Sequence, residues 1–146
     1  MPEPQNYKNH TRLVPTYHFF AVWVFLINII LTIVVLIRRW PHHIAMHIWM
    51  VVMALALFVL VTVARTFPLR VQDRVIRLEE QLRYQRLLPP DLLAASQSLT
   101  LRQIIALRFA SDAELPTLLQ RTLSENLEPK IIKQSITNWR PDNLRA

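Results

Sequence analysis

Three histidines gather between the two most apolar stretches of the chain, and their type and spacing could hold a cofactor. His43 and His47 stand four residues apart, so a helix would place both imidazoles on one face, where they could bind a metal ion. A single imidazole, such as that of His47, could also ligate a haem or a pigment. Without an accompanying carboxylate or cysteine, interfacial histidines that bond to water, lipid or loop carbonyls are the simpler interpretation. His43 and His47, with His42 beside them, therefore form an alternative cofactor-binding hypothesis.

The composition excludes several other kinds of chemistry. The chain has no cysteine, so it has no disulfide, thiolate nucleophile, iron–sulfur cluster or thiolate zinc site. It also has no glycine, which removes the glycine-rich loops that bind nucleotide phosphates. After residue 88 there are carboxylates and serines but no histidine, and no base stands at a recognisable spacing from a serine. We therefore expect a protein that is not an enzyme and binds no nucleotide.

Two apolar runs, residues 19–37 and 44–64, flank those histidines and are separated by a short basic loop at 38–43. At a rise of about 1.5 Å per residue they would extend roughly 28 and 31 Å as helices, close to the ~30 Å hydrocarbon core of a bilayer. The remaining residues are too few to cover two such helices in a soluble protein. No small-residue signal-peptide cleavage site follows the first run. The pattern predicts an all-α membrane protein, with a two-helix transmembrane hairpin followed by a helical cytoplasmic tail.

Two polar residues lie one helical turn apart within the first predicted span. Asn28 and Thr32 need hydrogen-bond partners in lipid, so we expect them to pack against the second span or another subunit. The span contains no ionisable residue of the kind that lines transport pathways. A transporter or channel is therefore not expected.

The net charge of +7 is concentrated around the predicted spans. Residues 1–70 carry six basic side chains and one acidic one, whereas the rest of the chain carries eleven basic and nine acidic ones. Such flanking charges set topology and meet anionic lipid head groups, so they do not indicate nucleic-acid binding. The loop has Arg38 and Arg39, and the side bearing both termini has Lys8, Arg12, Arg65, Arg70, Arg74, Arg77 and Arg83. We therefore expect both termini in the cytoplasm.

A basic amphipathic helix is predicted at 65–88, next to the membrane. Its apolar residues recur at spacings of four, three and four and form one seam, which consists of Val71, Val75, Leu78 and Leu82. Acids precede bases by four residues in two places, which predicts ion pairs of Asp73 with Arg77 and of Glu79 with Arg83. The seam is too short for a confident coiled coil. We expect it to dock against the rest of the tail or against a partner.

The remaining parts are a polar N-terminal arm at 1–18 and a small helical tail domain at 89–146. Thr100 with Gln103, and Ser111 with Glu114, have the capping-box spacing that opens a helix, the first of them over 101–110. A last helix is predicted to begin at Pro129 and to continue through Trp139. A core of about 50 residues is marginal alone, so we expect the tail to dock on a partner or on the membrane surface.

Four polar segments resemble an uncharacterised bacterial family of small two-span membrane proteins. They are Gln5-Asn6-Tyr7-Lys8-Asn9-His10, Arg77-Leu78-Glu79-Glu80-Gln81-Leu82-Arg83, Ala106-Leu107-Arg108-Phe109-Ala110-Ser111-Asp112 and Asn138-Trp139-Arg140-Pro141-Asp142. The resemblance implies a bacterial inner-membrane protein with a helical cytoplasmic tail, and it carries over no activity.

Three hypotheses for function follow. The first is an accessory or scaffolding subunit of a larger bacterial inner-membrane complex, in contact with lipid and with other membrane subunits. The second is a cofactor-associated subunit that uses His43 and His47. The third is a membrane-tethered adaptor that docks a soluble partner on the cytoplasmic helix. No cofactor is required by the sequence, and bound lipid is expected.

Overall fold

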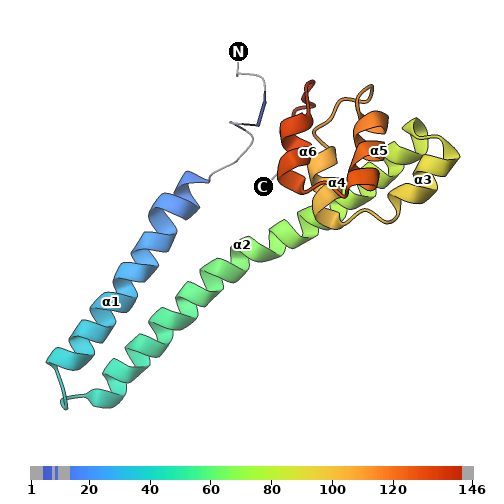
Figure 1. Ribbon diagram of the computed structural model, residues 1–146. Helices are drawn as coiled ribbons and strands as arrows, with labels where there is room; N and C mark the ends of the chain where they lie inside the picture. Colours follow the sequence, from blue (N-terminus) through green and yellow to red (C-terminus); the bar gives the residue numbers. More distant parts are fainter. Residues whose placement is uncertain (1–4, 8, 10–13, 143–146) are drawn as a thin grey trace. The chain divides into compact units, whose positions relative to one another are not determined.

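The computed structural model describes residues 5–7, 9 and 14–142, and every regular element among them is a helix, which confirms the all-α prediction. Lys8 and Arg12, on which the predicted orientation partly rests, lie outside the described residues, as do residues 1–4 of the predicted arm. The first element is η1 (Thr16–Ala21, a π-helix). The helices labelled in Figure 1 follow it: α1 (Val22–Arg38), α2 (Ile44–Leu87), α3 (Pro90–Ser96), α4 (Leu101–Leu107), α5 (Leu115–Glu125) and α6 (Pro129–Ser135).

The chain divides at Pro68 into two compact units. Arg12–Pro68 forms one unit, called here the hairpin, and Met1–Thr11 with Leu69–Ala146 forms the other, called the helical domain. Helix α2 contributes to both, since it continues through Pro68. The sequence analysis placed a span at 44–64 and a separate helix at 65–88, whereas the structure has one continuous helix. Pro68 removes a single backbone donor, and the leucines, arginines and glutamates that follow are good helix formers.

The hairpin consists of η1 with α1, a turn at residues 39–43, and the first part of α2 (Figure 1). Shielded side chains follow one stripe on α2, at spacings of three and four residues: Ile44, His47, Val51, Ala54, Phe58, Val61 and Arg65. On α1 the buried Thr32 lies on a similar stripe with Phe25, Asn28 and Leu36. Thr32 and Ala54 are small, and small residues let two apolar helices approach closely. These stripes hold most of the shielded side chains of the two helices.

The rest of the hairpin surface is apolar and uncovered. Both the helical run Thr16–Arg38 and α2 are long and apolar enough to cross a bilayer, and only 6% of the most apolar stretch of each is buried. A core helix of a soluble protein would be mostly buried. The exposed fraction therefore fits helices whose surroundings are lipid, as the sequence predicts for residues 19–37 and 44–64.

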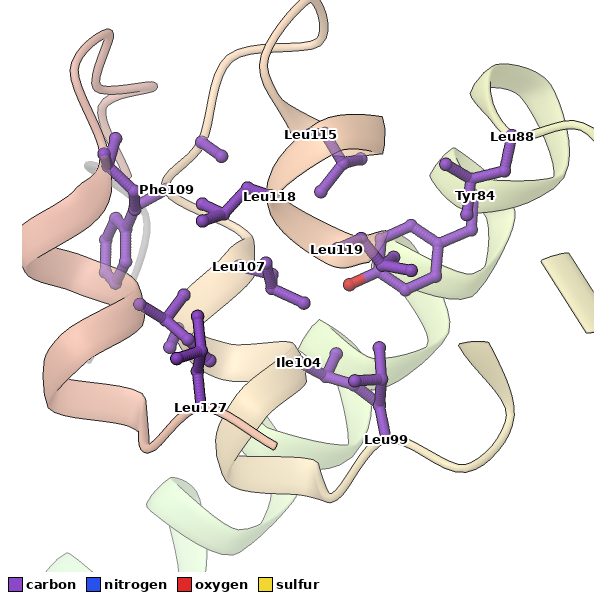
Figure 2. Packing of buried hydrophobic residues seen from close by; sticks show 14 residues of the cluster. Tyr84, Leu88, Leu99, Ile104, Leu107, Phe109, Leu115, Leu118, Leu119 and Leu127 are labelled. Atoms are coloured by element: carbon purple, nitrogen blue, oxygen red, sulfur yellow. The ribbon is translucent and has the colours of Figure 1, made fainter. Parts of the chain in front are cut away.

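The helical domain has a core of its own, built from the end of α2 and from α3 to α6. Its cluster of buried residues consists of Tyr84, Leu88, Leu99, Ile104, Ala106, Leu107, Phe109, Ala110, Leu115, Leu118, Leu119, Leu127, Ile132 and Ile136. Figure 2 shows the ring of Tyr84 reaching from α2 toward Leu119 and Leu107. Trp139 packs against Phe109, with ring centroids 5.1 Å apart. The tail predicted at 89–146 thus encloses the last turns of the preceding helix as part of its core.

One of the two predicted capping boxes is present. The Thr100 hydroxyl accepts from the Gln103 N–H, and the Gln103 side chain accepts from the Thr100 N–H, which opens α4 as expected. The second prediction is wrong, because α5 begins only at Leu115, with Glu114 at the N-cap and Pro116 in its first turn. The Glu114 carboxylate instead accepts the backbone N–H groups of residues 137 and 138, at 2.9 and 3.2 Å. A contact with a distant segment has replaced the local cap.

Other helix boundaries differ from the expected ones for similar reasons. Helix α4 ends at Leu107, and α6 ends at Ser135, because the segments that follow them pair through an antiparallel bridge between Ala110 and Trp139. Helix α3 was not predicted, although Pro90 at its first position is a common helix start. Helix α5 ends at Asn126, whose left-handed backbone (φ 47°) takes the place that glycine usually fills in other proteins.

Candidate functional site

The predicted seam on α2 lies on the surface of the helical domain. The exposed fractions of Val71, Val75, Leu78 and Leu82 are 61, 47, 58 and 53%. The opposite face of the same helix carries the buried residues Ile76, Glu80, Arg83 and Tyr84, and this face holds the domain. The seam therefore does not pack against the described part of the tail, which was one of its two expected partners. Its docking against a different molecule stays a prediction.

A cleft of about 450 Å³ runs beside the seam within the helical domain. Val75 and Leu82 of the seam line one wall, together with the polar side chains of Gln72, Glu79 and Arg86. Residues 140–142 and Arg108 close the other side. The cleft thus places apolar and charged groups side by side along α2.

The inner wall of the cleft is held by a buried arginine. Arg83 is 2% exposed, and its guanidinium donates to the Glu80 carboxylate (Nη1 to Oε2, 3.2 Å) and to Asp112 (Nε to Oδ1, 2.8 Å). It also donates to the backbone carbonyls of residues 108 and 110, at 3.4 and 2.7 Å. A buried guanidinium is costly to desolvate unless its donors are satisfied. Here one side chain binds α2 to the segment that follows α4.

Glu80 and Tyr84 share this environment. Burial raises the pKa of Glu80 above its ordinary value, while the charges of Arg83, Arg140 and Arg108 oppose that rise. Arg140 contributes from 3.6 Å (Nη1 to Oε1). Burial, together with the negative charge of Glu80, also raises the pKa of the Tyr84 phenol. The side chains of Glu80 and Tyr84 are both part of the interior of the domain, because each is almost completely buried.

A second buried arginine joins the C-terminal segment to this cluster. Arg108 pairs with Asp142 (Nη2 to Oδ2, 3.0 Å), and its guanidinium lies 4.6 Å from the centre of the Phe109 ring. The Asp142 N–H donates to the Gln5 side chain at 2.8 Å, and the Arg140 N–H donates to the Phe109 carbonyl at 2.7 Å. The four polar segments on which the family resemblance rests therefore meet around Arg83 and Arg108. Their charges mainly bind one another.

The two histidines of the cofactor hypothesis lie at the start of α2. His43 directly precedes α2 with a left-handed backbone (φ 52°), and its carbonyl accepts the His47 N–H at 3.2 Å, the i to i+4 bond with which a helix starts. Its side chain is exposed, whereas His47 is partly shielded and lies within the first turn of α2. In the described part of the chain no three His, Cys, Asp or Glu residues gather as a metal site would need. Whether His43 and His47 bind a metal ion, a haem or a pigment stays a prediction.

Asn28 and Thr32 both lie on the shielded stripe of α1. The Thr32 hydroxyl donates to the Ile29 carbonyl of its own helix at 2.9 Å, so it needs no partner on the second span. The Asn28 side chain is partly shielded and makes no hydrogen bond within the described residues. Of the two polar groups, Asn28 is thus the one that would gain from a partner in another subunit.

The basic residues flank the hairpin as expected from the sequence. Arg38 and Arg39 are exposed at the turn, and the Arg65 guanidinium lies 5.9 Å from the centre of the Tyr17 ring. In α2, the exposed arginines beyond Pro68 are Arg70, Arg74, Arg77 and Arg86. Their roles in topology or in lipid head-group binding stay predictions.

The two ion pairs predicted along this part of α2 are not formed. No salt bridge joins Asp73 to Arg77 within the described residues, and Arg83 turns inward to Glu80 and Asp112 instead of to Glu79. The sequence analysis missed the cluster of Glu80, Arg83 and Arg108 for this reason. The sequence did offer one signal for this cluster, namely the charged residues on the face of the helix opposite the apolar seam. When a small domain packs on that face, those charged residues become buried and must pair.

Comparison with known protein families gives a match over the full chain. The model of DUF6526, a family of unknown function, matches residues 1–146, which confirms the predicted resemblance to an uncharacterised family. No curated protein and no solved structure matches the chain.

Proposed function

The chain belongs to the DUF6526 family, and from this premise we propose that it is a non-catalytic accessory or scaffolding subunit of a larger bacterial inner-membrane complex. Its hairpin crosses the membrane twice, both termini lie in the cytoplasm, and lipid contacts its two spans. The helical domain is the part that meets other proteins.

The surface of the hairpin supports its place in the membrane. Its exposed side chains are large and apolar on all sides of both helices, and exposure of this kind in water would lead to aggregation. Exposed arginines stand at the turn and just beyond Pro68, as basic residues do at the ends of spans. The larger number on the side of the termini supports the cytoplasmic placement of both ends.

The observation that carries the proposed role is the exposed seam on α2. It belongs to the same helix as the second span, so a protein docked there is tethered to the membrane. The charged side chains beside it, on Glu80, Arg83, Arg108 and Asp142, are engaged in ion pairs that stabilise the domain. An uncovered apolar stripe on the surface of a domain that has its own core is typical of a binding module.

Mild detergent extraction tests the proposal. The tagged chain should leave the membrane only with detergent, and sizing should show it in a particle that contains other polypeptides. A matched pair of variants links the result to the seam: Leu82→Asp should make this particle smaller, and Gln81→Asp, at the neighbouring exposed position, should not. Recovery as a monodisperse particle of this chain alone, or release by an alkaline wash without detergent, would overturn the proposal.

A further inference from the structure

The exposed seam is the largest uncovered apolar feature of the helical domain. Among the described residues after Pro68, six large hydrophobic side chains are exposed, and four of them are the seam residues Val71, Val75, Leu78 and Leu82. The other two, Leu101 and Ile131, lie on different helices. An apolar stripe of this kind on a water-exposed helix needs a cover.

The spacing of the seam gives it a coiled-coil register. Steps of four, three and four place Val75 and Leu82 at a positions and Val71 and Leu78 at d positions of a heptad. In that register Arg74 takes a g position and Glu79 takes the e position that follows. Both side chains are exposed, and neither has an ion-pair partner within the described residues.

We propose that a second copy of this chain covers the seam, so that two α2 helices pair in parallel where they leave the membrane. The inference deepens the proposed function, because it rests on both copies being anchored in one bilayer. Two copies inserted in the same orientation have their α2 helices running in the same direction, which is the arrangement that a parallel pair requires.

Charge complementarity favours this occupant. In a parallel two-stranded coiled coil, a g residue of one helix faces the next e residue of the other. Arg74 of one copy therefore meets Glu79 of the second copy, and two-fold symmetry forms the same pair again on the other side. The pairing thus places Arg74 opposite Glu79, and neither of these residues forms an ion pair within the described part of its own chain.

The fold leaves room for the second helix. The domain packs on the face of α2 that carries Ile76, Glu80 and Tyr84, so a partner helix can approach the seam without displacing the core. The cleft lies along the e positions, where Gln72, Glu79 and Arg86 line it. Twelve residues would be short for a free coiled coil, but anchoring in one membrane raises the effective concentration of the two helices.

Cysteine crosslinking in native membranes tests the pairing, since the chain has no cysteine of its own. Leu78→Cys and Val75→Cys place a thiol on the seam, and Arg77→Cys is the matched control beside it. Two differently tagged copies of each variant are expressed together and oxidised. The seam variants should shift from the monomer mass of 17.2 kDa to roughly twice that mass in a product that carries both tags, and the control should not.

Charge exchange in the Leu78→Cys background tests the register. Arg74→Glu alone and Glu79→Arg alone each bring like charges together and should lower the crosslinked fraction severalfold. The double variant exchanges the two charges within each copy and should restore the crosslinked fraction. A seam that lies on the lipid surface, or that binds a different protein, would give no such restoration.

The outcomes separate this inference from the proposed function. Absence of the doubly tagged product from both seam variants, or crosslinking of a seam cysteine only to another polypeptide, overturns the second copy as occupant while the accessory role stands. A doubly tagged product from a particle that contains this chain alone supports the pairing and overturns the accessory role.

Discussion

The hairpin and the helical domain place their apolar residues in opposite ways. In the hairpin, large apolar side chains such as Trp23, Ile30 and Leu60 are 58 to 62% exposed, whereas the domain buries Leu107, Leu115 and Leu119 completely. The two regions share one helix, so helix propensity does not explain the difference. We infer that the solvent does: lipid accepts an apolar surface, and water expels one. The seam on α2 is the place where the domain departs from this rule.

The buried arginine of the domain offers the largest test of this comparison. Arg83→Met removes the partner of the buried Glu80 and should destabilise the domain by about 3 to 5 kcal/mol. Arg121→Met removes half of an exposed pair with Glu125 and should cost roughly 0.5 kcal/mol or less. Hydrogen exchange of α4 and α6 amides in the full-length protein measures both effects. Equal protection in the two variants would contradict the structural role assigned to Arg83.

The same substitution in the two regions sharpens the comparison directly. Leu55 in the second span and Leu82 on the seam are 48 and 53% exposed. Leu55→Arg puts a charge near the centre of the bilayer at a cost of about 2.5 to 3.5 kcal/mol and should lower the membrane-integrated fraction. Leu82→Arg lies in water and should leave that fraction unchanged. The readout is the amount of protein that resists an alkaline wash, and equal losses would end the distinction between the two exposed surfaces.

A side-chain cap is formed at α4 of the domain and not at α1 of the hairpin. Thr100→Ala removes a formed capping box and should cost about 1 kcal/mol, while Ala21 caps α1 without any side-chain bond. Ser111→Ala, in a sequence of the same capping-box type, should cost little because the structure forms no box there. Chemical denaturation of the full-length protein in detergent compares the two variants. A larger loss from Ser111→Ala would show that α5 begins where the sequence pattern places it.

Glu80 gives the smallest expected effect, seen as a dependence on pH. Because its folded-state pKa is raised above the ordinary 4.5, the folded domain holds this proton more tightly than the unfolded chain does. The contribution of Glu80 to the stability of the fold is therefore most favourable when the pH is below the ordinary pKa of 4.5. This contribution declines as the pH rises through the folded-state pKa. Stability of the wild type relative to Glu80→Gln should fall with pH over this window. If the stability of the wild type relative to Glu80→Gln rose with pH instead, the folded-state pKa of Glu80 would be lowered and not raised.

The features that the sequence predicts well are those set by solvent or by neighbours in the chain. The hairpin turn near 38–43 follows from two apolar runs that are each long enough to cross a bilayer, and the start of α4 follows from the contact of Thr100 with Gln103. The failures come from distant contacts. Glu114 is used by the segment at 137–138, and Arg83 turns toward Asp112, so neither makes its expected local bond.

The candidate site is predictable only in part, for the same reason. The seam of Val71, Val75, Leu78 and Leu82 is visible as a periodic pattern, but its exposure depends on which face of α2 the domain covers. The meeting of four polar segments around Arg83 and Arg108 depends on contacts between residues up to 137 positions apart. No local pattern encodes that meeting.

Thiol labelling in intact cells tests most directly the claim that the hairpin crosses the bilayer twice. His42→Cys places a thiol in the turn, and Ser124→Cys places one on the exposed surface of the helical domain. A reagent that cannot cross the cytoplasmic membrane should label the turn in intact cells, and it should label the domain only after the membrane is opened. Equal labelling of both positions in intact cells would contradict the hairpin, and labelling of the domain alone would reverse its orientation.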